Sequence, residues 1–302
     1  MSNAQHSRSA TAATAETTFK EEPTLSLAGT RTDLEYGEMP STAGRISLWQ
    51  HLNTDVDPAE CTGPLAAFCF MTGFIDCISF SAIFVWCGFQ TGNFAQLALA
   101  LARLWEPSPT GSGHNTEFHI ADRQALTSLL TFNIGAFFGR FGDRIGSHKR
   151  IWLVGATLLQ VLFTAAAAIA IWQSNQGSVA EIRGDPSWTG PLTYLGIAFM
   201  SASLGLQGIQ GKRLNTQFTT TIVLTTVWVE LVTDPRLFNL RQKVITRDHK
   251  LIAAVALFTG AFVARAILAS AGAPTALGVG AGIRVLIALS WIVIPGKKLA
   301  KA

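Results

Sequence analysis

One nearly uncharged stretch decides the fold of this chain: PLAAFCFMTGFIDCISFSAIFVWCGFQTGNFAQLALALARLW, which runs from Pro64 to Trp105. Its only formally charged residues are Asp76 and Arg103, and the polar residues at 90–93 interrupt it. A helix of a soluble domain keeps one polar face, whereas a bilayer-spanning helix needs about 20 apolar residues. The stretch is too long for one span, and the part after its break is short for a second. We therefore expect a membrane protein with a polar break inside the membrane.

The composition supports a membrane protein and argues against a soluble or nucleic-acid-binding one. Of the 302 residues, 49% are hydrophobic and 14% are charged, compared with roughly 25% charged residues in soluble proteins. The net charge is +4, but the basic residues gather in a few loops, so we interpret them as topology signals. The four cysteines show neither a CxxC motif nor zinc-site spacing, so we expect buried free thiols and no metal.

The chain divides into three parts by composition. Residues 1–45 are rich in Ser, Thr, Ala and Glu and contain no apolar run, so we expect a disordered tail without a secretory signal. Residues 46–296 form the expected helical transmembrane domain, in which 46–52 would be a short interfacial helix. Residues 297–302 form a basic tail, expected on the cytoplasmic side.

Eight apolar segments follow the tail and predict the transmembrane architecture. They lie at about 64–86, 92–105, 125–143, 151–172, 191–210, 218–233, 251–271 and 277–294. The second and sixth segments are short for a membrane span, and a polar loop with proline follows each of them. The order full, short, full, full occurs twice, which indicates one repeat over about 64–172 and a second over about 191–294.

A local match and the distribution of basic residues support this repeat. The motif G-A-F-x-x-R occurs at 135–140 and again at 260–265. If six segments cross and the two short ones are re-entrant half helices, the loops at 140–150 and 212–250 and the C-terminal tail put most Lys and Arg on one side. By the positive-inside rule that side is cytoplasmic and holds both termini. We therefore expect an all-α polytopic membrane protein built as an inverted repeat, with a seven-span variant as the alternative.

Asp76 is the first candidate functional residue, because an acid inside a membrane segment is costly and by default a functional-site candidate. It shares a helix face with Gly73 and Ser79, which lie one turn to either side. As a functional residue, Asp76 would bind a proton or a cation. Alternatively, it would make a structural hydrogen bond to backbone at the helix break or an ion pair, for example with Arg140.

The polar residues of the break itself are the second candidate site. Thr91, Gly92 and Asn93 precede a helix that we expect to begin near Phe94. They would either cap the free N–H groups of that half helix or leave those groups to hold an anionic group of a solute.

The second short segment has its own polar cluster. Thr219, Thr220 and Thr221 open it, and they would face the first break across a central site. Threonine hydroxyls also bond backbone carbonyls within helices, so a structural role is the alternative. Gln207, near the end of the preceding segment, carries an amide that needs a partner in lipid.

Other residues of the apolar segments have structural interpretations. Gly135, Gly139 and Gly142 have the small-residue spacing of closely packed membrane helices. Arg265 and Arg284 lie inside apolar segments. We expect each to snorkel toward the membrane surface or to pair with an intramembrane acid, and snorkelling is preferred for Arg265.

Three sequence signatures resemble a known family. They are DVD at 55–57, GFIDCISF at 73–80 and QTGN at 90–93. Together they look like the YoaK-like membrane proteins, catalogued as domain of unknown function 1275 (DUF1275). GLQ with the following threonine-rich stretch is similar to a further signature of that family, with Thr226 as a departure where the family often has glycine.

The resemblance covers roughly residues 46 to 295, and the long N-terminal tail looks like the fungal branch of the family. It implies a multi-pass membrane protein, commonly with six spans, and no established activity.

These observations favour a small-solute or ion transporter with a central site between two half helices. The alternative is a non-transporting membrane scaffold or assembly protein, in which the polar residues bond internally and no cavity reaches Asp76. The sequence has no hydrolase, zinc-enzyme, P-loop or dinucleotide-binding motif, so we expect no enzymatic activity, no catalytic residue and no cofactor. The expected partners are the lipid bilayer, a small solute or proton and a second copy of the chain, but no nucleic acid. The plasma membrane is the favoured location.

Overall fold

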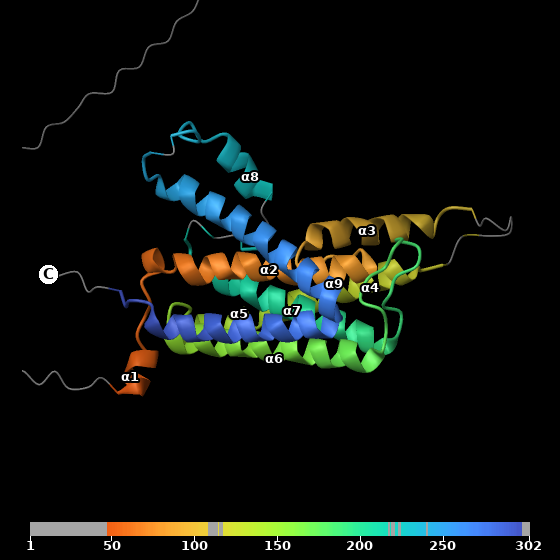
Figure 1. Cartoon of the computed structure of the whole chain (residues 1–302), viewed down its shortest axis with the longest axis horizontal. Coiled ribbons are helices and arrows are strands. Elements are labelled where there is room, and N and C mark those ends of the chain that lie inside the picture. The colour runs from red at the N-terminus through yellow and green to blue at the C-terminus, as the bar shows by residue number, and fades with distance from the viewer. Residues whose placement is uncertain are drawn as a thin grey trace, which may run out of the picture. The chain divides into compact units, whose positions relative to one another are not determined.

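The protein is all-helical over the residues that the computed structural model describes, which are 47–107, 114, 117–216, 218, 221–222, 225–239 and 241–297. The helices are α1 Leu48–Leu52, α2 Thr62–Ile83, α3 Gln90–Arg103, α4 Ile120–Phe137, α5 Gly139–Ile145, α6 Arg150–Ser174, α7 Pro191–Arg213, α8 Thr225–Val232 and α9 Ile245–Val293 (Figure 1). A 3-10 turn, Pro58–Glu60, precedes α2. The expected disordered tail at 1–45 lies outside the described residues.

Four helices, α2, α6, α7 and α9, are long and apolar enough to cross a membrane. They are compatible with a membrane protein, as the composition predicts. The helix α9 is broken at Gly272, where φ is 79° and ψ is 172°. Glycine adopts this conformation without a Cβ clash, and Pro274 follows it inside the helix. The break divides α9 into a first part before Gly272 and a last part after it.

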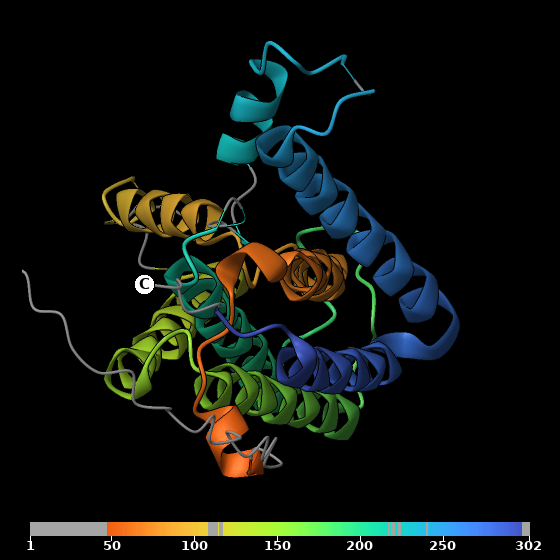
Figure 2. The same cartoon turned by 90° about the vertical axis from the view of Figure 1, so that its left-hand side faces the viewer.

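Successive long helices run in opposite directions. In Figure 1, α2, α6 and the first part of α9 run from left to right, whereas α4, α7 and the last part of α9 run from right to left. The short helices also differ, since α3 runs toward the right and α8 toward the left. Figure 2 looks along the long helices and shows the two parts of α9 separating at the break.

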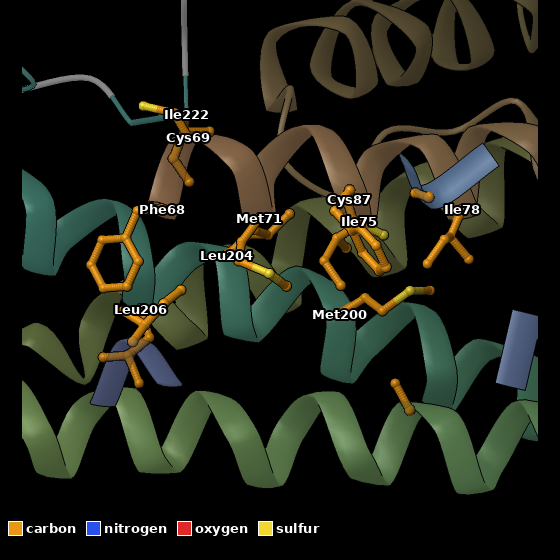
Figure 3. Packing of buried hydrophobic residues seen from close by; sticks show 14 of the residues in the cluster. Phe68, Cys69, Met71, Ile75, Ile78, Cys87, Met200, Leu204, Leu206 and Ile222 are labelled. Carbon is orange, nitrogen blue, oxygen red and sulfur yellow. The ribbon is translucent and has the colours of Figure 1, made fainter. Parts of the chain in front are cut away.

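The core extends over all the long helices, and one part of it lies between α2 and α7. Met71 and Ile75 of α2 point toward Leu204 and Met200 of α7, and all four side chains are fully buried (Figure 3). Phe68, one turn earlier in α2, packs on Trp291 of α9 with ring centroids 5.9 Å apart. The face that α2 turns to its neighbours is therefore apolar, except for the polar residues described below.

The helices α2 and α9 approach so closely that glycine is required on both. A Cβ atom added at Gly73 would lie 2.0 Å from the backbone carbonyl oxygen of Leu257. On the other helix, a Cβ atom at Gly260 would lie 2.0 Å from the carbonyl oxygen of Phe70. Small residues at such crossings let helix backbones touch, as in membrane helix pairs.

The helices α4 and α7 make the same kind of contact. A Cβ atom at Gly135 would lie 2.1 Å from the carbonyl oxygen of Ala202, and one at Gly205 would lie 2.0 Å from that of Phe132. The two helix pairs therefore share a crossing in which each backbone meets a glycine of the other.

The other two glycines predicted to pack lie against side chains. A Cβ atom at Gly139 would come within 2.5 Å of the Ile209 side chain, and one at Gly142 within 2.4 Å of the Trp152 ring. Both glycines belong to α5, a separate short helix, whereas the sequence predicted one segment over 125–143. That boundary was wrong, because α4 already ends at Phe137.

The DVD motif is part of an extended strap between α1 and α2. Val56 N donates to His148 O at 3.0 Å, and Asp57 N donates to Pro295 O at 2.9 Å. The buried Arg150 side chain donates to the Thr54 hydroxyl and to Ile294 O, the latter at 2.5 Å. The strap therefore joins the start of α6 to the end of α9.

Candidate functional site

The break of the first half is the loop 84–89. The helix α2 ends because Phe84 takes the left-handed conformation, with φ 57°, which is uncommon for a non-glycine residue. Aromatic rings hold the loop, since Trp86 stacks on Phe80 with centroids 4.1 Å apart and meets the edge of Phe89 at 5.4 Å. The turn is thus built from apolar side chains rather than from the polar residues that follow it.

The expectation that residues 91–93 cap a later helix is wrong. The helix α3 begins at Gln90 and has no side-chain cap, because the turn is complete before the polar residues are reached. Asn93 is buried in the first turn and donates to Trp86 O at 2.6 Å and to Ser128 Oγ at 3.0 Å. Asn93 therefore fastens α3 to the loop and to α4.

Asp76 lies beneath the loop and is 1% exposed. Its Oδ1 accepts a 2.7 Å hydrogen bond from the backbone N–H of Gly88. Its Oδ2 has no hydrogen-bond partner in the described part of the chain, and no cation pairs with it there. The structural alternative, a bond to backbone at the helix break, is thus present, whereas Arg140 lies over the Phe137 ring instead.

The backbone at Gly88 lies against this carboxylate. A Cβ atom at Gly88 would lie 2.7 Å from Asp76 Oδ2 and 3.3 Å from Leu204 Cδ1. Ser79, buried one turn further along α2, donates to the Asp76 backbone carbonyl at 3.3 Å. Ser79 therefore bonds within its own helix and not to the Asp76 carboxylate.

Gln207 connects α7 to α2 and, through α2, to the second polar cluster. Its Nε2 donates to Phe68 O at 2.8 Å and to Thr72 Oγ1 at 2.9 Å. The Thr72 hydroxyl in turn donates to Thr221 O at 2.9 Å. This chain of bonds fixes the backbone at Thr221, whereas its own hydroxyl is buried without a partner among the described residues.

One cavity brings the start of α3 and the residues before α8 together. Its volume is about 330 Å³. It is lined by Gly88, Gln90, Thr91, Phe132, Ala136, Gly205, Gly208, Ile209, Lys212, Thr221 and Ile222. Two threonines, a glutamine and a lysine thus lie among otherwise apolar lining residues, and no acid is among them. A cavity of similar volume between Thr62, Asn215 and His249 contains none of the candidate residues.

The cavity includes two of the predicted site residues, Thr91 and Thr221. Its lining does not include Asp76, Ser79, Gly92, Asn93 or Gln207. Thr219 and Thr220 lie outside the described residues. Gly88 and Lys212 are lining residues that the sequence did not single out, because one is a loop glycine and the other was interpreted only as a topology signal.

Arg284 does not behave as the sequence predicted. It is fully buried, so it neither snorkels to the surface nor pairs with an acid within the described residues. It donates to Gln160 Oε1 in α6 and, at 3.4 Å, to Ser203 Oγ in α7. Gln160 also donates to Gln210 Oε1 at 2.7 Å. The signal in the sequence for this cluster was the presence of two glutamines, Gln160 and Gln210, within apolar segments.

Two further charged residues of the apolar segments are at the surface. Arg265 is exposed along α9, and Glu230 of α8 pairs with Lys250 at 2.8 Å. Across the described ranges, His, Cys, Asp and Glu side chains form no group of three or more suited to a metal ion.

The fold and the site define an all-helical protein with apolar helices of membrane-spanning length and a small, partly polar cavity. The chain belongs to the family described as "Protein of unknown function (DUF1275)", whose model matches residues 65–290. The match covers α2 to the last part of α9 and so includes the cavity. No curated protein and no solved structure matched the chain.

Proposed function

We propose that this protein is a multi-pass membrane transporter for a small solute or ion, with its binding site in the cavity between α3 and Thr221. The six spans would be α2, α4, α6, α7 and the two parts of α9, with both termini in the cytoplasm. The short helices α3 and α8 would be half helices of an inverted repeat. No catalytic step is part of the proposal.

The pattern of helix contacts supports the repeat. In this repeat α2 would correspond to α7, α4 to the first part of α9, and α6 to the last part of α9. The glycine crossing of α2 with the first part of α9 then corresponds to the glycine crossing of α7 with α4. The contact of α6 with α7 maps onto that of the last part of α9 with α2, where Phe68 meets Trp291. Corresponding helices also run in opposite directions in Figure 1, as an inverted repeat requires.

The cavity is the observation that carries the proposal. Its lining joins Gly88 and Thr91 from the first break to Thr221 and Ile222 from the second. Inverted-repeat transporters bind substrates where broken helices of the two halves meet, and irregular backbone at membrane depth is tolerated only where it is buried or lines a cavity.

Asp76 would carry the proton that accompanies the solute. A buried carboxylate without a counter-ion is unfavourable, so the side chain would be neutral while Gly88 covers it. Its titratable neighbours are the Cys77 and Cys87 thiols, which interact with it electrostatically. Movement of the loop 84–89 would admit water from the cavity to Oδ2, and the acid could then ionise.

Reconstituted vesicles test this function. The full-length protein is placed in liposomes that enclose a pH-sensitive dye, and a panel of neutral, anionic and cationic small solutes is added outside. We expect one class of solute to drive proton movement in the wild type and not in D76N. The matched control D143N changes an exposed carboxylate that pairs with Arg213 at 2.7 Å, so it should transport normally. Equal transport by D76N and wild type, or no movement of any solute, would contradict the proposal.

A non-transporting scaffold is the second candidate. It is favoured by Asn93, Gln207 and Ser79, whose side chains all bond within the protein. It does not account for the Thr221 hydroxyl or Asp76 Oδ2, both buried without a hydrogen-bond partner among the residues that the structure describes. Under this alternative, D76N and wild type would be equally inactive in vesicles and would differ in what they associate with in native membranes.

A further inference from the structure

We infer that the loop between α8 and α9 binds the headgroups of anionic phospholipids at the membrane surface. The binding surface, called the basic patch below, consists of Arg236, Arg241, Lys243 and the ring of Phe238. Lipid binding there goes beyond the proposed function, because it requires a bilayer around the helices but no transported solute.

Arg247, in the first turn of α9, gives the loop a fixed shape. Its side chain is 3% exposed, and its guanidinium donates to the backbone carbonyls of Arg236, Asn239 and Gln242 at 2.8, 2.7 and 3.0 Å. The remaining N–H groups donate to the Asp248 carboxylate at 2.6 and 2.9 Å. All five donors of this arginine are therefore used inside the protein, and the loop is wrapped around one side chain.

The three cations of the basic patch have no counter-ion. Arg236, Arg241 and Lys243 are exposed, and none of them forms an ion pair with another residue that the structure describes. Because the loop backbone converges on Arg247, these side chains extend from one small turn. An anionic lipid surface supplies the opposite charge, and each Lys or Arg close to such a surface contributes to binding.

The acids near the basic patch do not neutralise it. Glu230 pairs with Lys250 at 2.8 Å, and Asp248 is occupied by the buried guanidinium. Asp234 belongs to the loop itself, and its Oδ1 accepts a 2.8 Å hydrogen bond from the backbone N–H of Arg236. Between residues 233 and 244 one carboxylate thus stands against three cations, so the loop carries a net positive charge.

Phe238 and the adjoining helices favour a lipid surface over an acidic soluble partner. The Phe238 side chain is 91% exposed, and exposed apolar side chains lie on both sides of the loop, Trp228 and Val232 in α8 and Ile245 and Ile252 in α9. Figure 1 shows the loop at the far ends of α8 and the first part of α9, away from the other helices. A bilayer accounts for all of these features, because the helix faces contact acyl chains, the ring enters the interface and the cations meet headgroups.

Fluorescence quenching in nanodiscs tests the basic patch on the full-length protein. A dye is attached at N239C in a C77S background, since Cys77 is the only one of the four native thiols that is not buried. The nanodiscs contain phosphatidylcholine with a minor share of phosphatidylglycerol, and either lipid carries a nitroxide close to its headgroup. We expect phosphatidylglycerol to be enriched about fivefold at the dye, the ratio for one headgroup held by one basic side chain.

The charge variants ask whether the cations cause this enrichment. The triple variant R236Q/R241Q/K243Q should bring the ratio of the two lipids close to one. The matched control removes the same charge from exposed positions outside the loop and should keep the wild-type ratio: R123Q/R144Q/R265Q. An unchanged ratio in the loop variant, or an equal fall in the control, would overturn the basic patch.

Two further variants test the ring and the shape of the loop. F238S should lower quenching by both lipids, because the dye would move toward water. R247K keeps the charge but has three donors in place of five, so the ratio should fall although the three cations remain. Unchanged quenching in F238S would exclude insertion of the ring, and an unchanged ratio in R247K would exclude shaping by Arg247.

The remaining outcomes distinguish other ligands and the transporter. Absence of quenching by either lipid would overturn the lipid assignment in favour of an acidic soluble partner. Inorganic phosphate should lower the ratio no more than chloride at equal ionic strength, and a larger fall would assign the patch to free phosphate. Solute movement in vesicles without lipid enrichment would leave the transporter and remove the lipid contact, whereas enrichment without solute movement would do the reverse.

Discussion

The Asp76 carboxylate and the Gly88 backbone N–H are joined by a 2.7 Å hydrogen bond that spans the break between α2 and α3. The same glycine forms part of the cavity wall. One residue therefore stands between a buried acid and the space that a solute would enter. Any movement of the loop 84–89 would therefore change the surroundings of the Asp76 carboxylate.

Replacing Gly88 by alanine tests this contact. The added Cβ would lie 2.7 Å from Asp76 Oδ2, so the loop or the carboxylate must move. We expect G88A to lower the free energy of unfolding by about 1–3 kcal/mol, as overpacking does, measured by reversible SDS unfolding in mixed micelles. G155A, where nothing lies within 4 Å, should be neutral or slightly stabilising. Equal stability of G88A and wild type would show that the loop does not rest on the carboxylate.

The glycine crossings predict a symmetric pattern of damage. Alanine at Gly73, Gly260, Gly135 or Gly205 would bring its Cβ to about 2 Å from a facing carbonyl oxygen. Each single substitution should therefore cost about 2 kcal/mol or more, seen as a lower thermal unfolding midpoint in detergent. G278A, on an open helix surface, is the control and should gain up to about 1 kcal/mol. Tolerance at one crossing and damage at the other would contradict their equivalence.

The Arg284 cluster predicts that removing the acceptor does more harm than removing the charge. Q160M would leave a fully buried guanidinium without its main acceptor, at a cost of about 3 kcal/mol. R284M would leave only an amide oxygen unpaired, at about 1 kcal/mol. The double variant should be more stable than Q160M alone, because it removes the buried charge, whereas Gln210 Oε1 loses its donor in both variants. Unfolding titrations of the wild type, the two single variants and the double variant form a double-mutant cycle. If the stability losses of the single variants add up in the double variant, Gln160 and Arg284 are not coupled.

The Asp143–Arg213 pair predicts a small stability change at acid pH. The hydrogen bond from Arg213 holds the pKa of the Asp143 carboxyl below its ordinary value. The pair therefore contributes to stability at pH values above the pKa of Asp143 in the unfolded chain, which is about 4. This contribution is lost as the pH falls through the lower pKa that Asp143 has in the folded protein. The difference in unfolding midpoint between wild type and D143N should shrink over that window and stay small throughout, because both side chains are exposed. A difference that grows on acidification would contradict a lowered pKa of Asp143 in the folded protein.

The order of apolar segments predicted most of the helices because hydropathy is a local property. The segments at 151–172 and 191–210 correspond to α6 and α7 with small changes at their ends. The break in α9 was also expected, since the segments at 251–271 and 277–294 are separated by Gly272 and Pro274. Family membership likewise followed from the signatures around Asp76 and is confirmed by the match over 65–290.

The details of the break could not be predicted from local pattern. QTGN reads as a cap because its residues are polar, yet the turn is made by Phe84 and the ring stack of Phe80 with Trp86. Aromatic residues in an apolar run do not distinguish a helix from a turn. The partner of Asn93, Ser128, is distant in sequence, so no pattern near Asn93 points to it.

By itself, the sequence determined that this chain is helical and apolar, that Asp76 lies in an apolar segment, and that each half carries a polar interruption. These properties depend on composition and periodicity, which neighbouring residues set. Only the tertiary structure decided that Gly88 covers Asp76, that Arg284 is buried among amides, and that Thr91 and Thr221 line one cavity. Those contacts join residues that no local pattern relates, because they lie on different elements that only the packing of the helices brings together.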